Sequence, residues 1–168
     1  NGNEAKDTAT GNSKEDQSKD DDTLVIAFGS DIANIDITHA YNYENNIVTT
    51  AIANQLFYYD ENSNIVPQLV DTWDQPDDKT YVYNIKQGVT FSDGTPLTAD
   101  DVVYSLERHH NPDNASELAW CFDSVDSIEK TGDYQVTVKL KKIDVTWDYA
   151  MATTASLVIS KAYSEANE

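Results

Sequence analysis

The hydrophobic positions of this chain fall into short runs and alternations, a pattern that predicts more strand than helix. Residues 23–29 form a compact apolar run closed by a glycine, which is typical of a buried strand. In residues 80–85 large apolar side chains alternate with more polar ones, which predicts a strand with one face toward water. Further strands are expected at residues 57–59, 70–73, 125–129, 134–140 and 155–160, with turns at 60–64, 74–78 and 130–133. The predicted fold class is therefore α+β, a mixed β-sheet domain with few helices.

Two longer segments show helical spacing of their apolar residues. Residues 45–56 predict one helix, and a second is expected directly after Thr98. Thr98 is a natural N-cap, and Asp100 and Asp101 would occupy the first turn, where the helix dipole favours anions. Shorter helical stretches are expected at residues 116–122 and 147–152.

Composition changes sharply at residue 22, which divides the chain into two parts. Residues 1–22 contain only two alanines as hydrophobic residues, with three lysines against seven acids. Such a segment cannot bury enough apolar surface to offset the entropy lost on ordering, so we expect a disordered acidic tether. The remaining residues hold nearly all the hydrophobic side chains, which suits one domain of ordinary size.

The charge balance excludes several classes of protein. The chain carries 11 Lys and Arg against 30 Asp and Glu, a formal net charge of −19. Because nucleic-acid-binding proteins gain affinity by neutralising phosphates with basic residues, no nucleic-acid partner is expected.

A single cysteine excludes an internal disulfide and a Cys-rich zinc site. No apolar run approaches the roughly 18 residues that a membrane-spanning helix needs.

The candidate acids and histidines have structural explanations. Asp100 and Asp101 are adjacent, and adjacent residues on a helix point about 100° apart, so a capping role is favoured over an acid/base pair. His109 and His110, with Asp113, lack the ligand spacing of zinc sites. A solvated helix end is favoured for the two histidines.

Nucleophilic chemistry is not expected either. Cys121 lies between two aromatic residues without a basic neighbour, which predicts an inert core thiol. The sequence contains no glycine-rich phosphate loop and no GxSxG or HExxH motif. We therefore expect no enzyme activity, no cofactor and no metal.

Aromatic residues offer a candidate binding surface. Tyr41 and Tyr43 lie beside Asn42 in a polar loop that follows the first predicted strand. Loops at the carboxyl ends of strands meet ligands in open sheets, and aromatic faces next to amides suit a peptide or a sugar. The alternative, that these tyrosines only cover an apolar surface, is equally consistent with the sequence. Trp120 and Trp147 leave the same choice open.

Residues 67–108 carry a long motif, PQLVDTWDQPDDKTYVYNIKQGVTFSDGTPLTADDVVYSLER. This stretch resembles the signature of the family 5 solute-binding proteins of ABC importers, the peptide- and nickel-binding proteins of bacterial envelopes. The resemblance extends over residues 23–168 and implies part of a two-lobed, type II periplasmic-binding-protein-like fold. In that fold the motif would supply turns at Gly88 and Gly94 and core side chains at Trp73, Tyr81, Tyr83, Phe91 and Leu97.

The resemblance also implies how the chain is divided. Residues 1–22 look like the spacer that follows a lipidated cysteine in a Gram-positive lipoprotein, the cysteine itself lying outside this chain. Residues 23–52 look like the opening strand, loop and helix of the first lobe, and residues 53–168 like the small α+β second domain. The remainder of the first lobe and the larger second lobe are absent, so we interpret the chain as a fragment or an isolated lobe.

For function, the resemblance implies capture of an oligopeptide or dipeptide at the extracellular face of the membrane or in the periplasm. Closure of two lobes would deliver the solute to an ABC permease without chemistry on the solute. A monomer is expected, with a lipid anchor as its only membrane contact. By position, the residues implied to meet the ligand are Ser30, Asp31, Ile32, Ala33, Asn34, Tyr41, Asn42, Tyr43, Trp120, Thr153 and Thr154.

Other functions stay open at this point. A nickel chelate, an oligosaccharide or an opine would fit the same scaffold, because a fold does not determine its ligand. A secreted carbohydrate-binding module would use Tyr41, Tyr43 and Trp120 as stacking faces. An envelope hydrolase would use Asp100 and Asp101, although no catalytic motif accompanies them.

Overall fold

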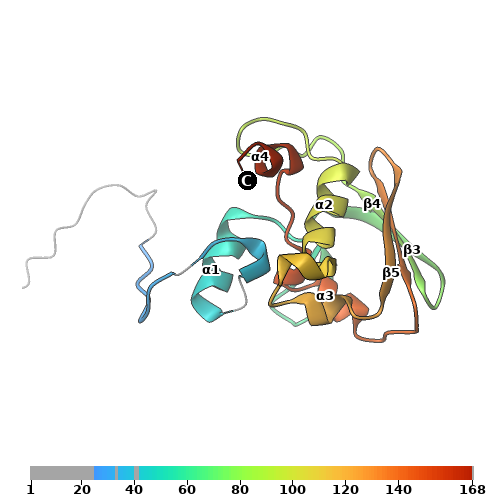
Figure 1. Ribbon diagram of the computed structural model, residues 1–168, viewed down its shortest axis with the longest axis horizontal. Helices are drawn as coiled ribbons and strands as arrows, with labels where there is room; N and C mark the ends of the chain where they lie inside the picture. Colours follow the sequence, from blue (N-terminus) through green and yellow to red (C-terminus); the bar gives the residue numbers. More distant parts are fainter. Residues whose placement is uncertain (1–24, 33, 40–41, 168) are drawn as a thin grey trace, which may run out of the picture.

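The computed structural model of the protein describes residues 25–32, 34–39 and 42–167, so the predicted tether lies outside the described residues. A four-stranded antiparallel sheet has the strand order β3-β4-β6-β5. Its strands are β3 (Val70–Asp77), β4 (Thr80–Ile85), β5 (Val125–Gly132) and β6 (Gln135–Leu140). β3 is longer than predicted, because the turn expected at 74–78 is confined to residues 78 and 79. Figure 1 shows helix α2 (Ala99–His110) beside this sheet, where it contacts β5 and β6.

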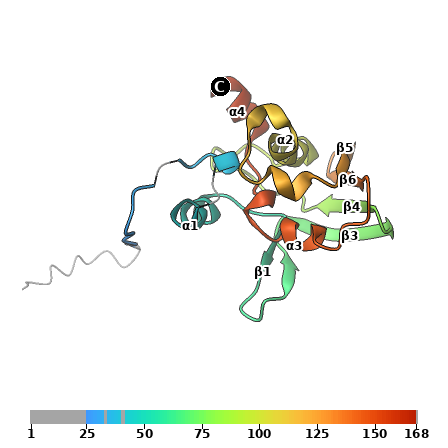
Figure 2. The same cartoon turned by 60° about the horizontal axis from the view of Figure 1, so that its bottom comes forward.

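A second, two-stranded sheet pairs β1 (Phe57–Tyr59) with β2 (Ile65–Pro67). Asp60 closes the connecting turn, since its Oδ1 accepts the backbone amides of Asn62 and Asn64 at 2.9 and 2.8 Å. This turn confirms the one predicted at residues 60–64. Figure 2 shows the hairpin projecting from the body of the molecule close to β3 and α3 (Trp147–Met151).

The remaining helical elements are short. α1 (Tyr43–Ile52) confirms the helix expected at residues 45–56, although it ends earlier, and α3 confirms the one expected at 147–152. α4 (Lys161–Asn167) is the last described element. The 3-10 helices are η1 (Ile37–His39), η2 (Pro112–Asn114), η3 (Ala119–Phe122) and η4 (Thr154–Ser156). Within the part of the chain that the structure describes, no helix is long and apolar enough to cross a membrane.

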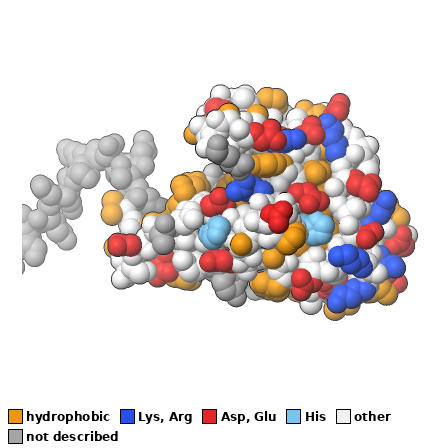
Figure 3. Space-filling view, in the orientation of Figure 1, with side chains coloured by type: hydrophobic (Ala, Val, Ile, Leu, Met, Phe, Trp, Pro, Cys, Tyr) orange, Lys and Arg blue, Asp and Glu red, His pale blue; other side chains and the backbone are white. Residues whose placement is uncertain are grey.

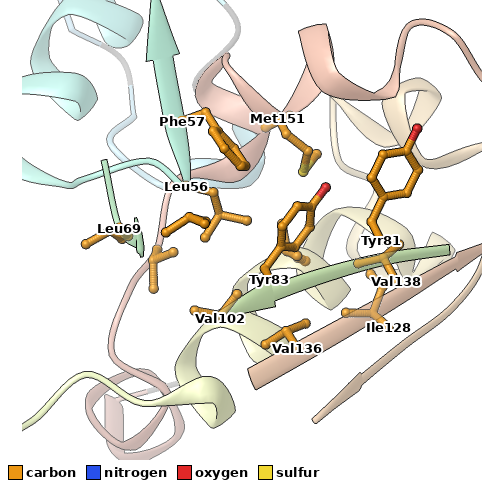
Figure 4. Packing of buried hydrophobic residues seen from close by; sticks show 14 of the residues in the cluster. Leu56, Phe57, Leu69, Tyr81, Tyr83, Val102, Ile128, Val136, Val138 and Met151 are labelled. Atoms are coloured by element: carbon orange, nitrogen blue, oxygen red, sulfur yellow. The ribbon is translucent and has the colours of Figure 1, made fainter. Parts of the chain in front are cut away.

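The hydrophobic core lies on one face of the four-stranded sheet. On β4, Tyr81, Tyr83 and Ile85 are buried while their neighbours are partly exposed, which confirms the predicted alternation. Figure 4 shows Phe57 and Tyr83 pointing toward one another, and their ring centroids are 5.7 Å apart. The Trp147 indole is fully buried, and its Nε1 donates to the Tyr83 hydroxyl at 2.8 Å. This hydrogen bond ties α3 to the middle of the sheet.

Two of the predicted strands are wrong. Residues 25–29 form no strand, and Val25 and Ile26 are 84% and 51% exposed. An apolar run becomes a buried strand only where another strand pairs with it, and among the described residues none does. Residues 155–160 are largely buried, as expected, but they pass through η4 and then make a single antiparallel bridge between Leu157 and Gln55.

Two side chains lie in environments that the sequence does not predict. Trp73 is 51% exposed and not part of the core, because β3 is an edge strand; the indole packs edge-on against Phe57. His109 is fully buried and not solvated. The chain after α2 folds back over this histidine, whose Nδ1 lies 2.7 Å from Ser116 Oγ and whose ring stacks on Phe122.

Gly88 and Gly94 occupy turns, as the motif predicts. Their φ values of 78° and 86° lie in the left-handed region, which residues with a side chain rarely adopt. The two glycines therefore allow the chain to turn between β4 and α2.

The start of α2 is held by the capping contacts that its sequence predicts. Thr98 is the N-cap and forms a capping box with Asp101, whose Oδ2 accepts the Thr98 amide at 2.9 Å. The other oxygen of Asp101, Oδ1, accepts the amide of Lys161 at 3.0 Å, at the start of α4. Asp100 points away from Asp101 and forms an ion pair with Lys130 at 2.6 Å. Both acids therefore have structural partners.

We expect Asp101→Ala to lower the free energy of unfolding by about 1–2 kcal/mol, because the amides of Thr98 and Lys161 lose their acceptor. Asp100→Ala is the matched control, since it removes the same charge but only an exposed ion pair, and its effect should be clearly smaller. Urea unfolding at neutral pH measures both variants. Equal losses would contradict the capping role of Asp101.

Candidate functional site

One cavity gathers three of the predicted site residues. It has a volume of about 390 Å³, and we call it the Trp120 cavity. Figure 2 shows α1, β1 and α3, which contribute to its walls, on the same side of the molecule. Its lining residues are Asn46, Tyr59, Leu118, Trp120, Cys121, Asp144, Thr146, Tyr149, Ala150, Thr153 and Thr154.

Contacts between segments that are distant in sequence hold the walls of the cavity. Asn46 in α1 donates its Nδ2 to Thr154 Oγ1 at 3.4 Å, which joins α1 to η4. The Tyr59 hydroxyl at the end of β1 donates to the carbonyl oxygen of Tyr149 in α3, also at 3.4 Å. Thr153 is the N-cap of η4. The cavity therefore depends on the tertiary fold, because its walls come from segments that are far apart in the sequence.

The aromatic side chains of the cavity are open to solvent. Trp120, Tyr149 and Tyr59 are 61%, 60% and 40% exposed. η3 carries Trp120 at the surface, whereas the next residue, Cys121, is buried. Exposed aromatic faces with hydroxyl groups beside them can stack on an amphipathic ligand. Of the two tryptophans that the sequence leaves ambiguous, the structure places Trp147 in the core and Trp120 at the cavity.

Asp144 and Cys121 are ionisable groups of the cavity with shifted pKa values. Asp144 Oδ2 accepts the Ser124 hydroxyl at 2.6 Å, and Oδ1 accepts the hydroxyl and amide of Thr146 at 2.6 and 2.9 Å. The hydrogen bonds from Ser124 and Thr146 hold the pKa of Asp144 below its usual range, so its carboxylate is negative at neutral pH. Burial raises the pKa of Cys121 to about 11, so its thiol stays protonated at neutral pH; the buried position confirms the predicted core thiol.

The cavity therefore contains stacking faces, hydroxyl and amide groups and a carboxylate. Across the described ranges, no three His, Cys, Asp or Glu side chains lie together in a way that could hold a metal ion. On the molecular face in Figure 3, acidic and basic side chains are intermixed with hydrophobic ones. The stacking faces and polar groups of the Trp120 cavity can together bind a small polar or amphipathic solute.

The described residues at the start of the first predicted loop do not line this cavity. Ser30, Asp31 and Ile32 are exposed and do not line it. Ala33 and Tyr41 were also predicted to meet a ligand, and both lie outside the described residues. A ligand role for this loop stays a prediction.

Three further predicted residues lie at turns and helix ends. Asn34 Oδ1 accepts the amide of Asp36 at 2.8 Å, and Asn42 Oδ1 accepts the amide of Asn45 at 2.9 Å as the N-cap of α1. Tyr43, at the start of α1, is 75% exposed and does not line the cavity. Among the described residues of the predicted set, the structure brings Trp120, Thr153 and Thr154 together at the cavity.

Sequence reasoning misses several cavity residues. Asn46, Tyr59, Asp144 and Tyr149 stand in four separate segments, and no spacing connects them. The signal that could have drawn attention to Tyr59 and Tyr149 is a large aromatic side chain on the polar side of a short element. That signal does not tell which exposed aromatic residues share a cavity.

Comparison with known proteins identifies the family. Residues 64–168 match the model of the bacterial extracellular solute-binding proteins, family 5 middle region. The chain belongs to this family. It is 30% identical over 139 residues to the glutathione-binding protein GsiB of Pectobacterium atrosepticum, covering 82% of this chain and 27% of that protein. It is 35% identical over 121 residues to the oligopeptide-binding protein AppA of Bacillus subtilis, covering 68% of this chain and 22% of AppA.

Solved structures agree with this assignment. The structure of AppA in complex with a nonapeptide matches with a TM-score of 0.73 at 28% identity, covering 79% of this chain and 26% of AppA. The binding protein AgaA of A. tumefaciens R10 with agropinic acid matches with a TM-score of 0.75 at 26% identity, covering 80% of this chain and 28% of AgaA. The predicted fold class, a mixed α+β part of a type II periplasmic binding protein, is confirmed.

The chain spans about a quarter of the length of the relatives that it matches, 27% of GsiB and 22% of AppA. These relatives are named as binding proteins and not as enzymes. Family 5 is a family of extracellular solute-binding proteins, which agrees with the predicted location outside the cytoplasm.

Proposed function

We propose that the protein containing this chain is the solute-binding component of an ABC importer that captures oligopeptides or dipeptides outside the cell. The observation that carries the proposal is the Trp120 cavity, in which Trp120, Thr153 and Thr154 meet. Membership in family 5 and the peptide-binding relatives support it. An ABC permease is the proposed membrane partner.

The chemistry of the cavity suits a peptide. The exposed face of Trp120 can cover an apolar side chain or a peptide plane, while the hydroxyls of Thr153 and Thr146 and the amide of Asn46 can pair with peptide groups. The thiol of Cys121 is protonated and buried, so it is a poor nucleophile. Capture and release without bond chemistry is the function that this set of groups supports best.

We further propose that residues 23–52 begin the first lobe and residues 53–168 form the small second domain. An open groove of about 460 Å³ supports this division, because it lies where α1 meets the C-terminal segment and is largely apolar. Ile52 and Tyr163 at this groove are 64% and 65% exposed. Such a surface is typical of a face that another part of a protein covers. Lobe closure over the ligand is the proposed delivery mechanism.

Other solutes are alternatives within the same family. The relatives found include proteins named for glutathione and a structure with agropinic acid. A carbohydrate-binding module would also use Trp120 as a stacking face. These alternatives differ in which ligand reaches the Trp120 cavity, so one titration experiment compares them.

The test is a titration of the ¹⁵N-labelled chain with tripeptides, glutathione, oligosaccharides and nickel–histidine. We expect tripeptides to shift the indole resonance of Trp120 and the amides of Thr153 and Thr154. Trp120→Ala should abolish the shifts at the two threonines, whereas the matched control Trp73→Ala, which removes an exposed tryptophan from an edge strand, should keep them. Shifts caused only by an oligosaccharide, or only far from this cavity, would contradict the proposal.

A further inference from the structure

Asp144 lines the Trp120 cavity together with the aromatic residues Trp120, Tyr149 and Tyr59. It accepts three hydrogen bonds, one from Ser124 and two from Thr146. An ionised carboxylate offers about four acceptor positions, so one position on Oδ2 is still available. The residue is half-buried and is one of the lining residues of the cavity.

No cation of the protein itself neutralises this carboxylate at contact distance. In the described portion of the chain, Asp144 forms no ion pair with a lysine, arginine or histidine within 4.0 Å. Lys142 is near enough to contribute to the lowered pKa of Asp144, but it does not line the cavity. The lining residues include neither lysine nor arginine.

The aromatic residues that line the cavity together with Asp144 favour a cationic ligand group. Trp120, Tyr149 and Tyr59 all line the cavity and are exposed by 40% or more. Aromatic faces attract a cation through their quadrupole, most strongly when the face is that of a tryptophan. A carboxylate beside such faces is the combination that holds an ammonium or guanidinium group in proteins.

We infer that the Trp120 cavity selects a cationic group, such as the side chain of lysine or arginine in a peptide, and that Asp144 determines this specificity. The inference rests on the proposed function and adds the ligand class. The structural alternative is that Asp144 only closes the loop before α3 through its bonds to Ser124 and Thr146. A purely structural Asp144 would not distinguish a charged peptide from a neutral one of the same shape.

The experiment compares three tripeptides on the full chain, each N-acetylated so that no α-ammonium group is present: Ala-Lys-Ala, Ala-norleucine-Ala and Ala-acetyllysine-Ala. Norleucine keeps the apolar stem of lysine without the ammonium group, and acetyllysine keeps its length without the charge. Binding is followed by the Trp120 indole resonance and by calorimetry at low and high salt. We expect Ala-Lys-Ala to bind about five- to tenfold more tightly than either neutral peptide, with the advantage reduced by salt.

Two variants locate the effect at the carboxylate. Asp144→Asn keeps an oxygen acceptor for Thr146 and removes the charge, so the preference for Ala-Lys-Ala should disappear. Asp123→Asn is the matched control, because it removes the same charge from an exposed neighbour that does not line the cavity. It should keep the preference. If Asp144→Asn does not fold, the comparison of the three peptides on the unchanged chain still decides between charge and shape.

The outcomes separate this inference from the function on which it rests. Equal affinities for the three peptides, with shifts at Trp120, would overturn the cation preference and leave peptide binding in place. A preference lost equally in both variants would assign it to overall charge and overturn the role of Asp144. No response of the cavity to any peptide would overturn both proposals.

Discussion

Replacing Trp147 with alanine is expected to lower the free energy of unfolding by about 3–5 kcal/mol. The indole is fully buried, packs edge-on against Phe122 at 5.7 Å and donates to the Tyr83 hydroxyl at 2.8 Å. Its removal leaves a large void between α3 and the sheet and deprives the buried Tyr83 hydroxyl of its donor. Urea unfolding followed by circular dichroism measures the loss.

Trp73→Ala is the matched control for this prediction. Trp73 is 51% exposed on an edge strand, so Trp73→Ala removes the same side chain from the surface and leaves little empty space in the core. Its loss should be about 1 kcal/mol, mainly from the contact with Phe57. If Trp147→Ala does not fold, Trp147→Phe replaces it in the measurement, because phenylalanine fills much of the space of the indole but cannot donate a hydrogen bond to the Tyr83 hydroxyl. Equal effects of Trp147→Ala and Trp73→Ala would contradict this description of the core.

Acidification from pH 6.5 to about 4.5 is expected to destabilise the protein through His109. The ring is fully buried, and its Nε2 has no hydrogen-bond partner among the described residues. Burial lowers the pKa of His109 to about 4, with the Asp36 carboxylate opposing this effect and Arg108 adding to it. In the unfolded chain the pKa of histidine is near 6.5.

The direction of the effect follows from proton binding. Between pH 6.5 and about 4 the unfolded chain binds a proton at His109 and the folded chain does not, so stability falls as the pH falls. Above pH 6.5 the neutral ring makes its full contribution to the free energy of unfolding. At about 1.4 kcal/mol per pKa unit, the free energy of unfolding is lower by roughly 3 kcal/mol when the pH reaches 4. Acids with lowered pKa values, such as Asp93 and Asp144, add their own losses mainly at lower pH.

Urea midpoints measured between pH 7 and pH 4.5 test this prediction. His109→Gln should flatten the pH dependence in this window, because glutamine does not titrate. His110→Gln is the control, since His110 is partly exposed and lies 3.2 Å from Glu107, and it should keep the slope. An unchanged slope in His109→Gln would show that another group carries the acid sensitivity.

Much of the local structure can be predicted from the sequence, because short-range chemistry decides it. The capping box of Thr98 and Asp101 needs only residues three positions apart, and the turn at Gly94 needs only a residue that tolerates positive φ. The alternation in β4 predicts which of its side chains are buried, since successive residues of a strand face opposite sides. The long motif at residues 67–108 identifies the family because it is made of such local cap, turn and strand patterns.

Which surfaces meet depends on the tertiary structure, and short sequence patterns do not predict it. The strands predicted from the apolar runs at 23–29 and 155–160 are not formed by the described residues 25–29 and 155–160, because hydrophobicity does not tell whether a partner strand lies beside a run. His109 is buried only because the chain around Ser116 folds back over α2. Trp73 is exposed because its strand is at the edge of the sheet.

The candidate site divides in the same way. The family, the α+β class and three residues that line the cavity could be predicted from local motifs and from a resemblance carried by position. Only the tertiary structure placed Asn46, Tyr59, Asp144 and Tyr149 around Trp120. Their proximity depends on hydrogen bonds such as Asn46 to Thr154 and Tyr59 to Tyr149, which join residues about a hundred positions apart. Local patterns extend over a few residues, so contacts of this range follow only from the folded chain.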